Sequence, residues 1–225
     1  FNINHTYSKT LSDAGAGRSG YNWQIEKTHG ESDRRQVFNA MVVYALPFGK
    51  GKSIQPSNAA VGALVSDWRV SSITRLRSGL PYGVIAAACT LPNAGGCRAS
   101  YNRDFTGDVR INGEWGSGDL LGARPQFLNP KAFKNPTAYT YGDTPGAGSY
   151  GLYNPGFWNE DLSVARQFRI KERIKMDFAA EFFNLTNSVI FNGPASLDIN
   201  NANFGRITGQ QNSPRSIQMS LKLQF

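Results

Sequence analysis

The chain has 225 residues, of which 40% are hydrophobic and 18% are charged, and its formal net charge is +8. No apolar run reaches the roughly 18 residues that a transmembrane helix needs, which excludes such a helix from this sequence. The 24 basic residues are scattered, with Arg34 and Arg35 the one adjacent pair, so the charge does not indicate a nucleic-acid partner.

Alternation of apolar and polar residues with a period of two recurs along the chain and predicts an all-β protein. The expected strands, each bounded by turn residues, cover 1–11, 36–48, 68–84, 157–170, 174–186 and 215–225. Several exceed the five or six residues that are usual in soluble sheets. They match the roughly 9–11 residues with which a tilted strand crosses a bilayer, so length favours a membrane barrel.

The strands differ in how cleanly their two faces separate. In 1–11, His5 and Lys9 fall among the apolar positions, and 36–48 is apolar on both faces. In 157–170, Glu160 and Arg166 interrupt an otherwise apolar face, so we expect both to lie near the ends of the strand, at a membrane interface.

The connections differ in length in a regular way. Residues 12–35, 85–156 and 187–214 are long, whereas 171–173 forms a tight turn and 49–67 is of intermediate length, with room for one short helix in AAVGALVSDW. In an antiparallel array every long connection would lie at one end. Outer-membrane barrels have this arrangement, with long loops outside and short turns in the periplasm.

The two cysteines, Cys89 and Cys97, flank a Pro-Asn-Ala-Gly-Gly turn. This spacing suits a local disulfide, which implies an oxidising compartment; two reduced, unconnected thiols are the alternative. His5 and His29 are the only histidines and neither is near the cysteines in sequence, so we expect no metal site. We expect no cofactor either.

The segment SIQMSLKLQF resembles the closing strand of Gram-negative outer-membrane proteins, which the barrel-assembly machinery recognises. The resemblance implies an assembly signal and an outer-membrane location. It rests on the alternate apolar residues Ile217, Met219, Leu221, Leu223 and Phe225.

Longer stretches resemble a particular class of receptor. SDRRQVFNAMVVYALPFGKGK (32–52), SDWRVSSITRLRSGLPYGV (66–84), PGFWNEDLSVARQFRIKERIKMDFAAEFFNLTN (155–187) and FGRITG (204–209) occur in this order. Together they are similar to the C-terminal barrel portion of TonB-dependent receptors of the Oar-like type, which often carry a carboxypeptidase-regulatory-like domain near the N-terminus. The resemblance implies that 1–225 is the last part of a transmembrane barrel of about 22 strands, with the plug domain and the energy-coupling box upstream of this chain.

The resemblance also implies partners: a lipid bilayer, the barrel-assembly machinery, a TonB-type coupling protein acting on the upstream segment, and a ligand of unknown identity. Charged residues on one face of the strands are expected to line the lumen and contact the plug or an anionic substrate. These are Arg69, Arg75, Arg77, Asp161, Arg169, Asp177 and Glu181.

No catalytic constellation is visible, and we expect no enzyme. Asp177 and Glu181 would stand about 13 Å apart along one strand, too far for a paired-carboxylate site. The aromatic residues of 85–156 suit either contact with sugars, peptides and partner proteins or packing of the loop on itself. Two other functions stay open: an outer-membrane scaffold or adhesion protein that uses its long loops, and a soluble secreted carbohydrate-binding β-domain.

Overall fold

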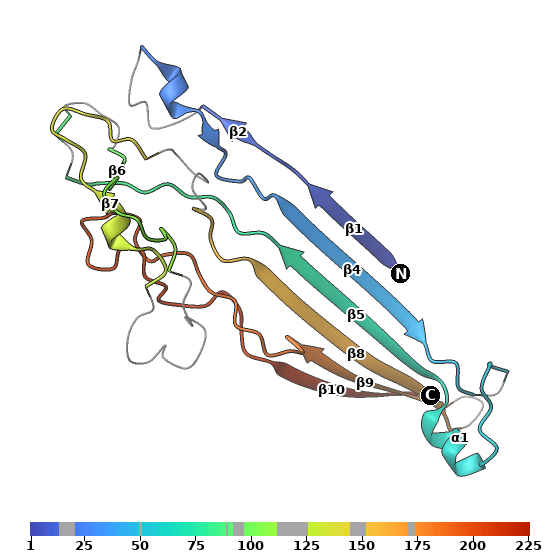
Figure 1. The fold of residues 1–225 in the computed structure, drawn as a ribbon. Coiled ribbons are helices and arrows are strands. Elements are labelled where there is room, and N and C mark those ends of the chain that lie inside the picture. Colours follow the sequence, from blue (N-terminus) through green and yellow to red (C-terminus); the bar gives the residue numbers. More distant parts are fainter. Residues whose placement is uncertain are drawn as a thin grey trace.

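The computed structural model describes residues 1–13, 21–49, 51–88, 90–91, 97–111, 126–144, 152–170 and 174–225. Long antiparallel strands form one twisted sheet, and irregular segments gather beyond one end of it (Figure 1). No helix among these residues is both long enough and apolar enough to cross a membrane.

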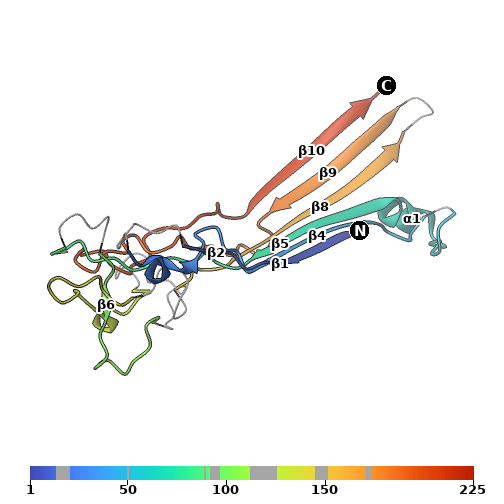
Figure 2. The same ribbon diagram turned by 90° about the horizontal axis from the view of Figure 1, so that it is seen from above.

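All six expected strands are present in a single sheet, in the order β1-β4-β5-β8-β9-β10. Their bounds are Asn2–Tyr7 (β1), Gln36–Ala45 (β4), Trp68–Arg77 (β5), Phe157–Arg169 (β8), Lys175–Phe183 (β9) and Ser216–Gln224 (β10). Each strand pairs with the next long strand along the chain, so the topology is an up-and-down meander. The sheet curves but does not close, and β1 and β10 form its two edges (Figure 2).

All six strands are shorter than predicted, and two of them end well before the predicted bound. The strand expected at 1–11 ends at Tyr7, and Leu11–Ser12 forms a separate short strand, β2, which pairs with β3 (Thr28–His29). The strand expected at 68–84 ends at Arg77, because Tyr82 and Val84 are buried in a core formed by the loops. The last two apolar residues of this alternation therefore lie in the loop core and not on a face of the sheet.

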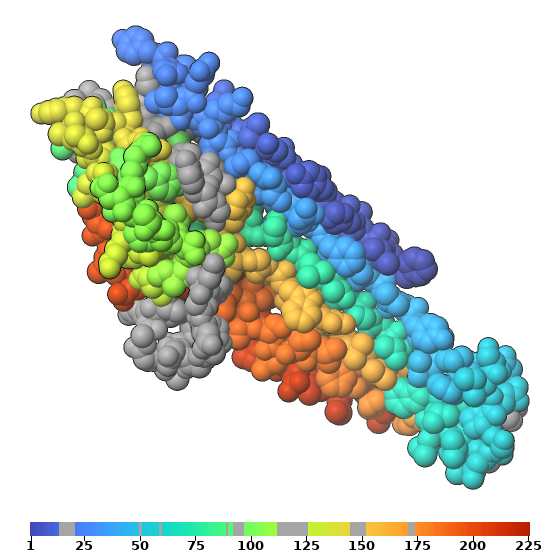
Figure 3. Space-filling view, in the orientation of Figure 1, coloured from blue at the N-terminus to red at the C-terminus, as the bar shows by residue number. Residues whose placement is uncertain are grey.

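The two ends of the sheet differ. The turn end carries the described parts of 46–67, which include the predicted helix, α1 (Ala59–Val65), and it is where β8 ends and β9 begins. The loop end carries the described parts of 8–35, 78–156 and 184–215, which we call the loop assembly. Figure 3 shows the loop assembly and the α1 region as two bodies at opposite ends of the sheet.

The loop assembly contains little regular structure. Its short elements are β2, β3, η1 (Trp23–Glu26), β6 (Ser100–Tyr101), η3 (Pro130–Ala132) and β7 (Phe133–Lys134), with β6 paired to β7. It nevertheless encloses a hydrophobic core that includes Phe127, Leu128, Leu152, Phe204 and Ile207. Most of the fully buried apolar side chains in the described residues lie in this core and not in the sheet.

Candidate functional site

The register of the sheet separates its side chains into two faces. One row across five strands runs through Val42, Ser72, Leu162, Phe182 and Ile217. We call the face that contains this row the apolar face. Its other apolar and aromatic members are Ile3, Tyr7, Phe38, Ala40, Tyr44, Trp68, Val70, Leu76, Trp158, Val164, Phe168, Met176, Phe178, Ala180, Met219, Leu221 and Leu223.

The apolar face is largely uncovered. Met219 is 70% exposed and Leu221 is 67% exposed, and Val42 also belongs to the exposed residues. Leu162 and Phe178 are half-buried. A soluble sheet of this size would bury such a face against a second layer, and the described residues supply no second layer over it. Nor does the sheet conceal its edges: β10, with Ile217, Met219, Leu221 and Leu223, has a paired strand on one side alone.

The opposite face, the polar face, brings the predicted charges together. Arg69, Arg75 and Arg77 of β5, Asp161 and Arg169 of β8, and Asp177 and Glu181 of β9 all lie on it. A row through Ser71, Ser163, Glu181 and Gln218 lies at its middle, and this row continues into the apolar Val43 of β4. The predicted assignment of these charges to one face is consistent with the register.

An ion pair organises the polar face near the loop end. Arg75 Nη2 lies 2.6 Å from Asp161 Oδ2. The other carboxylate oxygen, Oδ1, accepts hydrogen bonds from Asn159 Nδ2 at 2.9 Å and from the backbone N–H of Asn184 at 3.0 Å. Asp161 therefore ties β5, β8 and the end of β9 together, a role that its position in the sequence did not indicate.

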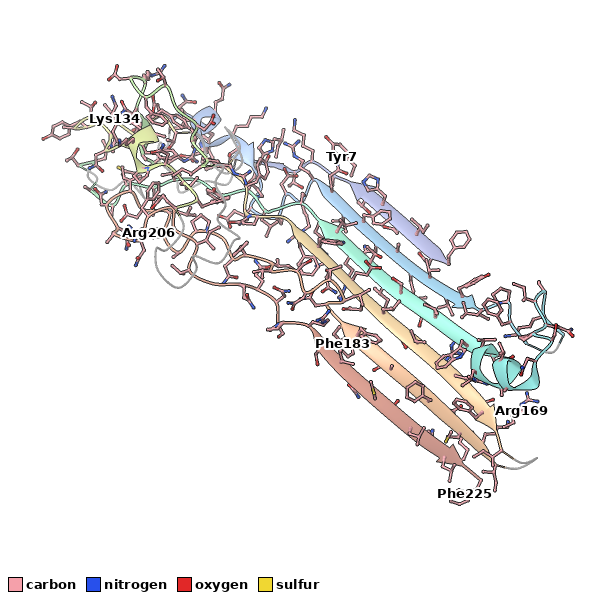
Figure 4. All side chains as sticks on the ribbon, turned by 60° about the horizontal axis from the view of Figure 1, so that its bottom comes forward. Tyr7, Lys134, Arg169, Phe183, Arg206 and Phe225 are labelled. Atoms are coloured by element: carbon pink, nitrogen blue, oxygen red, sulfur yellow. The ribbon has the colours of Figure 1, made fainter. Side chains whose placement is uncertain are left out.

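The remaining predicted charges occupy different surroundings. Asp177 accepts hydrogen bonds from Gln167 at 2.8 Å and from Gln224 at 2.7 Å. The guanidinium of Arg77 lies 5.5 Å from the centre of the Phe157 ring. Near the turn end, Arg69 and Asp177 help to line a hollow in the polar face together with Gln167, Ser220 and Lys222. Arg169 and Phe225 lie at the turn end, and Phe183 lies at the other end of its strand (Figure 4).

Glu160 and Arg166 do lie on the apolar face, in register with Thr74 and Trp68 respectively. Each stands three residues from an end of β8, as expected. Glu160 accepts a hydrogen bond from Ser72 Oγ at 3.3 Å, whereas Arg166 is buried and reaches the backbone of α1.

Some aromatic residues of 85–156 pack the loop on itself, and others are exposed and free to contact a ligand or partner, so both alternatives left open by the sequence apply. Phe127 and Phe133 are buried in the loop core. Tyr139 is 78% exposed, and Tyr141 is also exposed. Trp115 and Tyr150 lie outside the described residues. The described part of the loop therefore packs on itself and on 187–214, and it also presents Tyr139 and Tyr141 to solvent.

Buried charges fasten the first long loop to the rest of the loop assembly. Arg98 Nη2 lies 2.8 Å from Glu26 Oε2, and both side chains are largely buried. Asp33 is fully buried; it accepts hydrogen bonds from Thr10 N at 2.6 Å and from Arg35 Nε at 3.0 Å, and His29 Nδ1 stands 3.3 Å from it. The Glu26–Arg98 pair follows from no sequence motif, because its partners come from separate loops, whereas the Asp33 cluster lies within the first long loop itself.

These contacts predict a pH dependence for the loop assembly. Burial raises the pKa of the Asp33 carboxyl, but the hydrogen bonds from Thr10 and Arg35 and the charges of Arg35 and His29 outweigh burial, so its pKa lies below the ordinary 3.8. A carboxyl whose pKa is lower in the folded state than in the unfolded state stabilises the fold at pH values above its unfolded-state pKa. This stabilisation is lost as the pH falls through the folded-state pKa. We therefore expect the loop assembly to loosen below about pH 4.

Hydrogen exchange of the Thr10 amide, which donates to Asp33 Oδ1, measures this loosening once it is corrected for the intrinsic rate. Protection should be constant between pH 7 and 5 and fall at lower pH. Asp33→Asn should weaken protection at neutral pH and remove the contribution of this carboxyl to the acid-dependent loss. An unchanged acid profile in Asp33→Asn would show that other groups control the opening.

The predicted disulfide is described at one of its two positions. Cys97 is buried and disulfide-bonded. Cys89 lies outside the described residues, so the pairing of Cys89 with Cys97 stays a prediction.

Comparison with known proteins agrees with this geometry. The family model described as "Outer membrane beta barrel domain" matches residues 1–218. No curated protein matches the chain, and no solved structure matches it. An antiparallel meander of long strands, with an uncovered apolar face and a charged face behind it, is the arrangement that such a family requires. The chain therefore belongs to the outer membrane beta barrel domain family, and it is a protein of the Gram-negative outer membrane.

Proposed function

We propose that this chain is the C-terminal part of the barrel of a TonB-dependent receptor that moves a ligand across the outer membrane with energy from the inner membrane. Its apolar face contacts lipid, its polar face lines the lumen, and the loop assembly faces the cell exterior. The observation that carries this proposal is the separation of the two faces across β5, β8, β9 and β10. The receptor class itself rests on the sequence resemblance described above.

The open sheet supports the idea that further strands complete the barrel. Six strands are fewer than the roughly eight of the smallest membrane barrels. Unpaired backbone groups along β1 and β10 would be costly in hydrocarbon, where water cannot satisfy them. We infer that strands from outside these 225 residues pair with both edges and that a plug domain fills the lumen.

Charges on the polar face suit contact with a plug. Asp161 and Asp177 are held by neighbouring side chains, whereas Arg69 and Lys222 border the open hollow at the turn end. Charged and amide groups of this kind offer hydrogen bonds to a polar domain surface. On the lipid face at the bilayer midplane, one Arg or Lys would instead cost roughly 2–4 kcal/mol.

The proposal is tested in the full-length protein, with a photo-cross-linking amino acid at Ser71 on the polar face or at Val70 on the apolar face. We expect irradiation to join position 71 to a plug segment of the same chain, identified by mass spectrometry, and to join position 70 to no such segment. Depleting the coupling protein or collapsing the proton-motive force should alter the cross-link at 71. A full-length protein that lacks a plug and a coupling box would refute the transport function.

A scaffold or adhesion role is the second candidate, and the loop core favours it. A set of loops with its own buried core offers a fixed surface, on which Trp23 and Tyr139 are exposed. Such a protein would bind partners at this surface with no dependence on the coupling protein. The soluble secreted β-domain is wrong, because the chain belongs to an outer-membrane family.

A further inference from the structure

The helix α1 is unusual for a turn between strands because it is wholly apolar. Its sequence is AAVGALV, and Asn58 caps it by accepting hydrogen bonds from Ala60 N at 2.8 Å and Val61 N at 3.4 Å. Leu64 is 72% exposed and Val61 is 48% exposed. A helix of seven residues is too short to be stable alone in water. Tertiary contacts must therefore hold it, although two of its largest side chains point away from the protein.

Arg166 provides the contact at the C-terminal end of α1. Its Nη1 donates to Leu64 O at 2.8 Å and its Nη2 donates to Ala63 O at 2.5 Å. Trp68 Nε1 also donates to Leu64 O, at 2.8 Å. The last carbonyl groups of a helix have no partners within it and carry partial negative charge. A guanidinium at this position satisfies them and complements their charge.

The same contacts account for an arginine on the apolar face. The Arg166 guanidinium lies 4.3 Å from the centre of the Phe168 ring and 5.6 Å from that of Trp68, and Trp68 and Phe178 meet edge to face at 6.1 Å. Aromatic rings and helix carbonyls thus replace water around the two terminal nitrogens, whereas Nε is buried without a hydrogen-bond partner in the described residues. The residue is only 9% exposed.

The C-terminal end of α1 lies next to the apolar face. Trp68 and Phe178 belong to that face. Trp68 contacts the last turn of the helix through its hydrogen bond to Leu64 O. Figure 2 shows α1 beside the start of β5, at the turn end of the sheet. An apolar helix at this level would meet the boundary between lipid headgroups and acyl chains, where interfacial helices bury their apolar side.

We propose that α1 is a lipid-binding foot of the barrel. Val61 and Leu64 enter the acyl-chain region of the periplasmic phospholipid leaflet, and Arg166 is the residue that positions the helix there. The leaflet assignment rests on the orientation proposed above, with the turn end in the periplasm. The binding partner is the phospholipid leaflet itself.

The test uses the full-length protein in phosphatidylcholine vesicles, with an environment-sensitive fluorophore on Leu64→Cys. Ser57→Cys, in the same connection and also exposed, is the matched control. We expect nitroxide-labelled lipids to quench the label at 64 strongly and aqueous iodide to quench it weakly, with the reverse at 57. Leu221→Cys on the apolar face serves as the lipid-exposed reference, and the parent protein verifies that the native cysteines do not react.

Adding Arg166→Leu to Leu64→Cys should reduce lipid quenching to the level of position 57, while the label at 221 stays lipid-quenched in the Arg166→Leu background. If Arg166→Leu does not fold, Trp68→Phe removes one hydrogen bond to Leu64 O and should reduce the quenching partly. Equal iodide access at 64 and 57 would overturn the proposal, and unchanged quenching in Arg166→Leu would overturn the role of Arg166. An error in orientation has a separate signature: lipid quenching at 64 persists, but a membrane-impermeant reagent labels it from outside intact cells.

Discussion

Val164→Arg is expected to prevent stable insertion of the barrel. Val164 lies in the middle of β8 on the apolar face, between Val70 and Ala180 in the register. An arginine on the lipid face near the bilayer midplane costs roughly 2–4 kcal/mol. Because both neighbours are apolar, no acidic partner stands beside it. The free energy of unfolding from lipid vesicles in a urea titration measures the effect.

Ser163→Arg is the matched control for Val164→Arg, one residue away and on the polar face. Position 163 stands directly opposite Ser71 and Glu181. An arginine there has an acidic cross-strand neighbour, and such pairs contribute about 0.2–1 kcal/mol. We therefore expect Ser163→Arg to fold and insert like the parent protein. If Ser163→Arg were the more damaging of the two, the assignment of lipid and lumen faces would be reversed.

Gly142→Ala is expected to open the loop assembly while the strands stay inserted. Gly142 has a φ of +72°, and a Cβ there would stand 2.0 Å from the carbonyl oxygen of Arg98. The residues that follow Gly142 are hydrogen-bonded to the stretch 98–101. Thr144 N donates to Ala99 O at 3.0 Å, and Tyr101 N donates to Asp143 at 2.8 Å. The methyl group must push these two segments apart.

Two costs add in Gly142→Ala. The left-handed conformation costs a non-glycine residue about 1–2 kcal/mol, and forcing extra atoms into a packed site costs about 1–3 kcal/mol. Hydrogen exchange across 97–105 should therefore accelerate strongly. A folded barrel migrates differently in an electrophoresis gel before and after heating. We expect Gly142→Ala to keep this difference.

Gly51→Ala separates these two costs. Gly51 has a similar φ of +76°, but a Cβ there meets no atom within 4 Å. The substitution carries the conformational cost alone, about 1–2 kcal/mol, and it acts at the turn end. Exchange in 97–105 should not change in Gly51→Ala. Equal exchange rates in Gly142→Ala and the parent protein would show that the approach to Arg98 is not required for the loop core.

The strands and their faces were determined by the sequence itself. A strand with hydrocarbon on one side and polar groups on the other must alternate with a period of two. In β10 and β9 this alternation is nearly complete, and their predicted bounds differ from the observed ones by a few residues. Even Arg166, which breaks the pattern, lies on the face that the pattern assigns to it.

The loop assembly and the α1 contact were decided by the tertiary structure. Phe127 and Leu128 pack with Phe204 and Ile207, and Glu26 pairs with Arg98, although these partners belong to separate loops. The sequence has no periodic pattern that predicts such contacts, because the side chains of an irregular backbone do not point in regularly repeating directions. The alternation that ends in Tyr82 and Val84 predicts a longer β5. Both residues are instead buried in the loop core, because their apolar side chains pack there. Arg166 similarly looks like an error in a lipid-facing strand until α1, folded from a distant turn, places its carbonyl groups beside the guanidinium.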